Sequence, residues 1–206
     1  MEVANLKLTL GNEEREFLFR KGTADEAVVV QALKTAAYDV GRLRRGPELD
    51  GLYEGTSKRP LIIDAAADIG AAAVFFAHKF PRSRIIAFEA DPAKFQLLRA
   101  NTANLRVECV QSACTAIGEI YNNQAPEAQP FIVKFDVDAD NLFAFDAAWV
   151  ECTPVLIASL NECLIPGTAG LHKFIKVAAD WGRDLFYLDD NVFSVSRNER
   201  LMQAAS

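Results

Sequence analysis

Short apolar runs alternate with helical segments after Pro60, and this alternation constrains the fold more than any other feature. Runs typical of buried strands lie at residues 61–63, 84–88, 106–110, 131–135 and 155–159. Helical patterns lie at residues 69–80, 92–101, 115–121 and 171–181. Strands joined by helices predict an α/β fold, a mostly parallel sheet with helices on both faces. Two last runs, 185–188 and 192–196, predict a C-terminal antiparallel hairpin at its edge.

The chain before this alternation has a different pattern. Apolar positions on either side of a Gly-Asn pair predict a hairpin within residues 6–20. Thr23 and Asp25 can each cap a helix that runs to about Tyr38. Residues 41–60 are rich in glycine and charged side chains, which is typical of a mobile loop or of a boundary.

Composition bounds the number of domains and the kinds of partner. The 206 residues are 50% hydrophobic and 24% charged, which excludes a disordered chain. We expect an N-terminal cap of hairpin, helix and loop at residues 1–58 and one main domain at residues 59–206. The formal net charge of −6 argues against a nucleic-acid partner. Charges interrupt the most apolar stretch, so no membrane partner is expected.

Cysteine and histidine usage argues against a metal centre. The 4 cysteines form no C-x-x-C motif, and the chain has only 2 histidines. We interpret the cysteines as reduced thiols of a cytoplasmic protein, and charges throughout the first residues predict no secretory signal. His78 is interpreted as structural, because a cation near a helix C-terminus is favourable.

The turn from Asp64 to Gly70, D-A-A-A-D-I-G, is the first candidate site. It joins the first strand after Pro60 to its helix, and ligands of parallel sheets bind beyond the carboxyl ends of strands. Small residues let the backbone approach a ligand, and a helix N-terminus favours an anionic group. The alternative is an alanine-rich turn with a structural role only.

Glu89 is the second candidate, at the end of the next strand and about 20 positions beyond the turn. An acid at this place can accept hydrogen bonds from both ribose hydroxyls. The alternative is a charge that serves the next helix N-terminus, although Asp91 already supplies one. Turn and acid together favour nucleoside binding, and the missing G-x-G-x-x-G cluster disfavours a pyrophosphate.

The third candidate is the acidic segment that ends the fourth strand. Asp136, Asp138 and Asp140 occupy alternating positions there. Such carboxylates could bind a cation or act as a general base. The alternative is a solvated acidic loop.

The order of these features resembles the FkbM family of S-adenosylmethionine-dependent methyltransferases over most of the chain, from about Thr23 to Met202. The matching segments are L-I-I-D at 61–64 with Gly70, F-E at 88–89 with D-P at 91–92, V-K at 133–134 with Asp136, P-V-L-I at 154–157 with L-I-P-G at 164–167, and N-V-F-S-V at 191–195. The resemblance implies a Rossmann-like class I methyltransferase fold with a seven-stranded sheet. It also implies S-adenosylmethionine as the cofactor, bound at the ends of the first two strands.

The resemblance assigns a role to each candidate residue. The amino-acid part of the cofactor would lie against Asp64, Ala66, Asp68 and Gly70, the ribose against Glu89, and the adenine near Ser112 and Ala113. Asp136 and Asp138 would face the methyl group and the acceptor as candidate catalytic residues. The implied acceptor is a hydroxyl of a small molecule or glycan. The sequence defines no oligomeric state.

Three segments depart from the family pattern. The turn is usually D-x-G-A-N-x-G, and here Ala66 replaces the first glycine and Asp68 the asparagine. Asp68 would repel the cofactor's carboxylate by about 4 kcal/mol for charges about 4 Å apart at an effective dielectric constant of about 20. The fourth strand usually ends D-x-E-G-A-E and the fifth E-L-H-D-W, and Ser159 and Asn161 replace the carboxylate and the imidazole of the latter.

These departures leave three alternatives. The first is a working O-methyltransferase, in which positioning and a base promote an in-line displacement. The second is a catalytically inactive or engineered scaffold of the same fold that acts as a binding or interaction module. The third is metal-assisted methyl transfer with Asp136, Asp138 and Asn141 as oxygen ligands.

Overall fold

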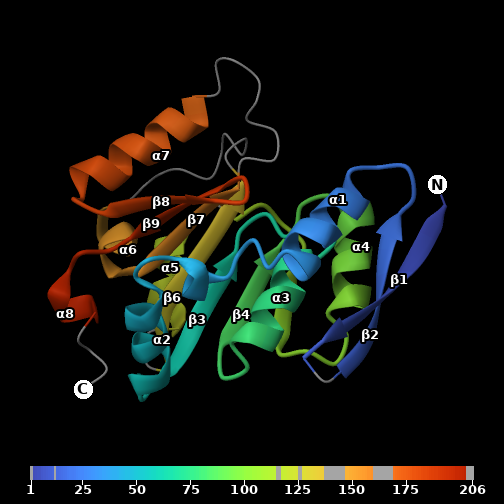
Figure 1. Cartoon of the computed structure of the whole chain (residues 1–206), viewed down its shortest axis with the longest axis horizontal. Helices are drawn as coiled ribbons and strands as arrows, with labels where there is room; N and C mark the ends of the chain where they lie inside the picture. Colours follow the sequence, from blue (N-terminus) through green and yellow to red (C-terminus); the bar gives the residue numbers. More distant parts are fainter. Residues whose placement is uncertain are drawn as a thin grey trace.

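The computed structural model describes residues 2–11, 13–114, 117–124, 127–136, 147–159 and 169–202. Its main sheet has seven strands in the order β5-β4-β3-β6-β7-β9-β8 (Figure 1). These strands are β3 (Arg59–Asp64), β4 (Arg84–Phe88), β5 (Val107–Val110), β6 (Ala128–Asp136), β7 (Val155–Ser159), β8 (Asp184–Leu188) and β9 (Asn191–Val195). Neighbours from β5 to β7 are parallel, and β9 pairs antiparallel with β7 and β8. The predicted fold class is confirmed.

Helices cover both faces of the sheet. Successive side chains of a strand point to opposite faces, and apolar side chains on both faces need to be buried. Ile62 and Ile132 point to one face, into an apolar cluster with Phe76 of α3. Ile63 and Val133 point to the other face, into a cluster with residues of α5, α6 and α7. The helices are α3 (Ala71–Lys79), α4 (Pro92–Asn101), α5 (Ile117–Gln124), α6 (Ala147–Cys152), α7 (Ala169–Asp180) and α8 (Glu199–Met202). The sequence patterns did not predict α6 or α8.

The N-terminal hairpin, β1 (Val3–Leu10) and β2 (Glu13–Arg20), is antiparallel as predicted and lies beside α4 (Figure 1). Asn101 at the end of α4 fixes this contact. Its side chain accepts a hydrogen bond from Leu18 N–H (2.7 Å) and donates to the carbonyls of Leu18 (2.8 Å) and Ile69 (2.8 Å). Phe17 of the hairpin belongs to the same apolar cluster as the sheet, so hairpin and sheet share one core.

The helix predicted to run to Tyr38 is shorter than expected. It consists of α1 (Asp25–Val29) and a π-helical turn, η1 (Val30–Lys34). Ala36 has a φ of 52°, a left-handed conformation that ends helical backbone. Asp25 is not the N-cap, because its carboxylate instead binds Arg20, with Oδ1 2.6 Å from Nη2.

Residues 41–60 are not a loop, which corrects the prediction for this segment. They contain the end of a 3₁₀ turn, η2 (Val40–Arg42), and α2 (Gly46–Gly55). Leu49, Leu52 and Tyr53 are buried at helical spacing. The Tyr53 ring packs edge-on against Phe80, with ring centroids 5.0 Å apart. The burial of these three side chains holds the segment in a helix, although its charged composition had predicted a mobile loop.

Two further observations concern the cysteines and the helices. Cys109 and Cys152 are free thiols in the structure. Across the described ranges, no helix combines the length and the apolarity that crossing a bilayer requires.

Candidate active site

The turn after β3 is fixed to both neighbouring strands by backbone hydrogen bonds. Ala65 N–H donates to the Lys134 carbonyl of β6 (2.8 Å), and Ala67 N–H donates to the Phe88 carbonyl of β4 (2.8 Å). Gly70 N–H then donates to the Ala67 carbonyl (2.8 Å) and closes the turn. The turn therefore lies across the carboxyl ends of three parallel strands, where the sequence predicted a ligand site.

Gly70 is required by the packing of α3 against α4. Its φ is 93°, in the region that favours glycine. A Cβ at this position would lie 2.9 Å from Leu98 Cδ1 and 3.4 Å from Leu98 Cα. A side chain here would therefore force either the Leu98 side chain or the turn to shift.

Asp68 also adopts a left-handed conformation, with a φ of 50°. Asp and Asn enter this region more readily than other residues with a side chain, so Asp can replace the Asn of the family pattern here. Its carboxylate lies 3.8 Å from Arg20 Nη2 and 3.4 Å from Lys94 Nζ. These two cations reduce the repulsion that the sequence predicted between Asp68 and the carboxylate of a cofactor.

Glu89 follows β4 and is half-buried. Its Oε2 accepts a hydrogen bond from Asp68 N–H (2.9 Å), and its Oε1 accepts one from Asp91 N–H (2.8 Å). The carboxylate is therefore held in one orientation between the turn and the start of α4. Each carboxylate oxygen can accept a second hydrogen bond, which leaves capacity for ribose hydroxyls.

Asp91, and not Glu89, caps α4. Its Oδ1 accepts hydrogen bonds from the N–H groups of Ala93 (2.8 Å) and Lys94 (2.9 Å). The bond from Lys94 N–H is the largest cause that lowers the pKa of this carboxyl. The alternative role of Glu89 as the charge at this helix N-terminus is thereby disfavoured.

Lys134 links two of the predicted acids and is a site residue that the sequence reasoning did not select. Its Nζ lies 3.3 Å from Asp64 Oδ1 and 3.0 Å from Asp136 Oδ1, and donates to the Ala66 carbonyl (2.7 Å). Lys134 and Asp64 are partners in the β6–β3 register, so their side chains leave the sheet on the same face. A lysine within the apolar run 131–135 was the signal that could have identified it.

Burial controls the electrostatics of this pair. The Asp64 side chain is 0% exposed, and burial raises its pKa to about 7 against the opposing effect of Lys134. Burial disfavours the Lys134 ammonium, but the carboxylates of Asp136 and Asp64 outweigh it and raise its pKa. Within the described part of the chain, neither oxygen of Asp64 has a hydrogen-bond donor, although Lys134 provides the ion pair.

Tyr38 covers this cluster from the N-terminal segment and was also not selected. It is 2% exposed, and Lys134 Nζ lies 5.8 Å from the centroid of its ring. Burial raises the pKa of its phenol. Asn191 of β9 ties the same segment to the sheet, because its amide donates to the Ala37 carbonyl (3.4 Å).

The remaining predicted residues are placed as follows. Asp136 ends β6 with its side chain 42% exposed. Ser112 and Ala113 follow β5 and are exposed, and Ser112 Oγ donates to the Ala113 carbonyl (2.9 Å). Asp138, Asp140, Asn141 and Asn161 lie outside the described residues. In the part that the structure describes, no group of three or more His, Cys, Asp or Glu could hold a metal ion.

Known structures share this fold at low sequence identity. A fibrillarin pre-rRNA processing protein from Methanococcus jannaschii has a TM-score of 0.53 and 13% identity, and the match covers 93% of this chain and 82% of that one. An O-methyltransferase from Bacillus cereus in complex with SAH has a TM-score of 0.49 and 16% identity, with 86% and 93% covered. No family model and no curated protein matches the sequence. Strand order and structural likeness together define the Rossmann-like fold of class I methyltransferases.

Proposed function

We propose that this chain is an S-adenosylmethionine-dependent methyltransferase, related to the FkbM family, that methylates a hydroxyl of a small molecule or glycan. The carrying observation is the position of Glu89. Its carboxylate is held at the end of β4 against the turn that follows β3, while Asp91 caps the next helix. A fixed acid beside such a turn is suited to a ribose.

The residues present fit the cofactor. Asp64 has two buried oxygens without a hydrogen-bond donor in the described ranges, and the cofactor's ammonium group is a donor of the required kind. Glu89 would accept the ribose hydroxyls, Ala66, Asp68 and Gly70 would shape the turn, and Ser112 and Ala113 would border the adenine. The bound cofactor supplies a methyl group activated as a sulfonium.

The chain's own residues would position the acceptor and accept its proton. Asp136 ends the strand between β3 and β7, and its partly exposed carboxylate can receive a proton from an acceptor hydroxyl. Lys134 holds Asp136 through the 3.0 Å ion pair and is a positioning residue. Asp138, two positions further, is the second proposed base.

The proposal includes the organisation and setting of the protein. Residues 1–58 would act as a cap over the ends of the strands, and residues 59–206 as the methyltransferase domain. Tyr38 supports the role of the first segment as a cap, because it packs over Lys134 of the sheet. The free thiols support a cytoplasmic location, and the net charge of −6 supports an acceptor other than nucleic acid.

Transfer of a labelled methyl group tests this function. The chain is incubated with tritiated S-adenosylmethionine and a panel of sugars, alcohols, phenols and RNA. We expect label in a hydroxyl-bearing small molecule, and a loss of about 100-fold or more in Asp136→Asn but not in Glu199→Ala, an exposed acid of α8. Label in RNA would contradict the acceptor class. Cofactor binding without transfer to any acceptor would favour the inactive scaffold.

A further inference from the structure

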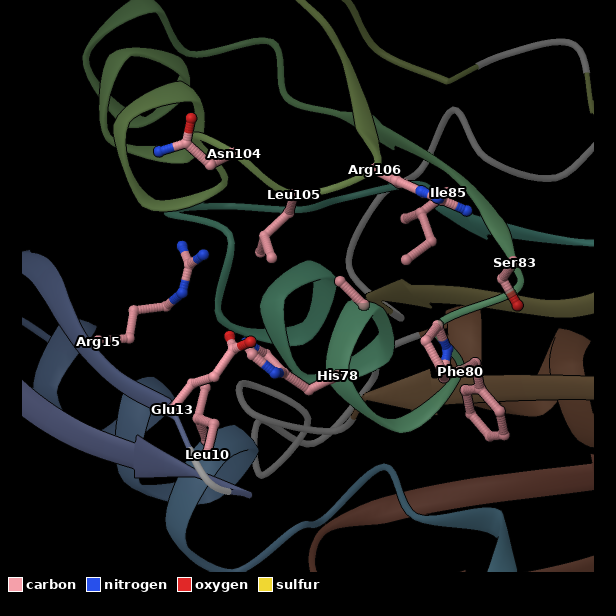
Figure 2. Close-up of a pocket in the computed structure, with 12 residues that line it drawn as sticks. Leu10, Glu13, Arg15, His78, Phe80, Ser83, Ile85, Asn104, Leu105 and Arg106 are labelled. Carbon is pink, nitrogen blue, oxygen red and sulfur yellow. The ribbon is translucent and has the colours of Figure 1, made fainter.

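A pocket lies at the end of the sheet opposite the candidate active site. It has a volume of about 700 Å³, within the range of small-molecule sites (Figure 2). Its walls include Ser83, just before β4, and Arg106, just before β5. Glu89 follows the other end of β4, and five residues of strand separate the two places by about 16 Å. The pocket is therefore distinct from the cofactor site.

Positive charge predominates in this pocket. Arg15 uses Nη1 to donate to the carbonyls of Asn101 (3.0 Å) and Ala103 (3.3 Å), and in the described chain its other nitrogens have no partner. Arg106 forms no hydrogen bond or ion pair with the described residues. Glu13 is the one carboxylate among the lining residues. The lining thus holds two guanidinium groups and one carboxylate.

His78 contributes a neutral polar group. Burial is the main cause that lowers its pKa, and Arg15 lowers it further against the opposing effect of Glu13. The lowered pKa favours the uncharged imidazole. Figure 2 shows the His78 ring facing the carboxylate of Glu13 at the floor of the pocket. The pocket keeps a net positive charge.

Two buried polar atoms of the lining lack a partner. Ser83 is 2% exposed, and its Oγ has no hydrogen bond to the described residues. His78 Nε2 is likewise buried, with no hydrogen-bond partner in the same ranges. Buried polar groups are nearly always hydrogen-bonded, so both atoms offer sites that a ligand would satisfy.

The rest of the lining is apolar. Leu10 comes from the hairpin, Phe80 from the end of α3, Ile85 from β4 and Leu105 from the loop before β5. Figure 2 shows Ile85 beside Arg106 and Leu10 beside Glu13. A ligand with an apolar body and one anionic end would match both parts of the lining.

We propose that this pocket binds a small organic carboxylate, independently of the cofactor. The Ser83 hydroxyl and the Arg106 guanidinium bind the carboxylate, because charge-assisted hydrogen bonds from arginine match its geometry, and Arg15 adds positive charge from the other side of the pocket (Figure 2). The apolar side chains contact the body of the ligand. The two arginines and Glu13 give the lining a net charge of about +1, which a ligand with one negative charge would neutralise.

An NMR titration of the ¹⁵N-labelled full chain with phenylacetate tests this proposal. Phenylacetamide, which has the same body without the charge, is the ligand control. We expect saturable shifts at the amides of Ser83 and Arg106 with phenylacetate and much weaker shifts with phenylacetamide. Arg106→Ala should weaken binding about fivefold or more, whereas Arg99→Ala, an exposed arginine of α4 outside the pocket, should leave it unchanged.

Three results would overturn the proposal. These are no saturable shift up to about 10 mM phenylacetate, equal binding of the amide, and equal affinity of the Arg106 and Arg99 variants. Ser83→Ala removes one hydroxyl and provides the same comparison if Arg106→Ala does not fold. Binding of S-adenosylhomocysteine is measured on every variant, because a loss confined to phenylacetate distinguishes this site from the cofactor site.

Discussion

Lys134 and Asp64 face each other across the β6–β3 register and form an ion pair, with Nζ 3.3 Å from Oδ1, whose side chains are 5% and 0% exposed. The cost of burying the Asp64 charge is reduced in two ways, by the ion pair with Lys134 and by protonation of the carboxylate. Asp64 also lies at the turn proposed to bind the cofactor. We therefore expect changes in this pair to affect both the stability of the fold and cofactor binding.

The buried Asp64 should make stability depend on pH. Its pKa rises from 3.8 to about 7 on folding, so the folded chain binds this proton more tightly than the unfolded chain. The contribution of Asp64 to stability therefore falls as the pH rises from about 4 to about 7, by an amount of order 4 kcal/mol. Urea unfolding of the wild type and Asp64→Asn across this range should show the asparagine variant gaining relative stability with pH. A constant difference would be inconsistent with a raised pKa.

Removal of the Lys134 charge should be strongly destabilising. Lys134→Met leaves the Asp64 carboxylate buried without its cation, which should lower the free energy of unfolding by about 3–5 kcal/mol near pH 8. The loss should shrink at low pH, where Asp64 is protonated. Asp64→Asn in the same chain should recover part of it. Lys176→Met, which breaks an exposed pair with Asp180, should cost less than about 1 kcal/mol. Equal losses in the two lysine variants would refute this view of the pair.

Gly70→Ala should destabilise the turn for two reasons. The left-handed φ of 93° and the 2.9 Å approach to Leu98 Cδ1 should together cost about 2–4 kcal/mol. Gly182→Ala is the matched control, because its φ is 57° but no atom lies within 4 Å of the added Cβ. Thermal unfolding should show a loss for Gly182→Ala of only about 1 kcal/mol. Losses of equal size would mean that contact with α4 does not matter.

Asp68→Asn should strengthen cofactor binding. Asparagine tolerates the φ of 50°, and the change leaves Arg20 and Lys94 without the carboxylate between them. We expect the affinity for S-adenosylhomocysteine to rise about fivefold at low salt and less at high salt. Calorimetric titration at two salt concentrations checks this. Weaker binding by the variant would show that Asp68 itself helps to hold the ligand.

Apolar runs and helix-capping residues predicted several strands and helices correctly. The apolar runs of β4 and β7 and the Asp91-Pro92 start of α4 are confirmed with their predicted bounds. The prediction of a loop at residues 41–60 was wrong, because it relied on the charged composition of the segment. The helical spacing of Leu49, Leu52 and Tyr53 was not taken into account. The early end of the first helix depends on the left-handed Ala36, which no local pattern indicated.

The site was predictable in part. Asp64, Glu89 and Asp136 follow strands, and strand ends could be identified from apolar runs. Lys134 gave a signal, as a lysine within an apolar run, but its partner Asp64 is defined only when β6 pairs with β3. Tyr38 could not be selected, because its role arises only when the N-terminal segment packs over Lys134. The pocket lined by Arg15 and Arg106 could not be predicted for the same reason, since separate segments contribute its walls.

Calorimetric titration with S-adenosylhomocysteine, on the wild type and Glu89→Ala, tests the central claim most directly. We predict a dissociation constant in the micromolar range, about 8 kcal/mol of binding free energy. The variant should bind about 100-fold more weakly, because two charge-assisted hydrogen bonds to the ribose are lost, whereas Glu199→Ala should bind like the wild type. No heat at millimolar ligand, or equal binding by wild type and Glu89→Ala, would contradict the account.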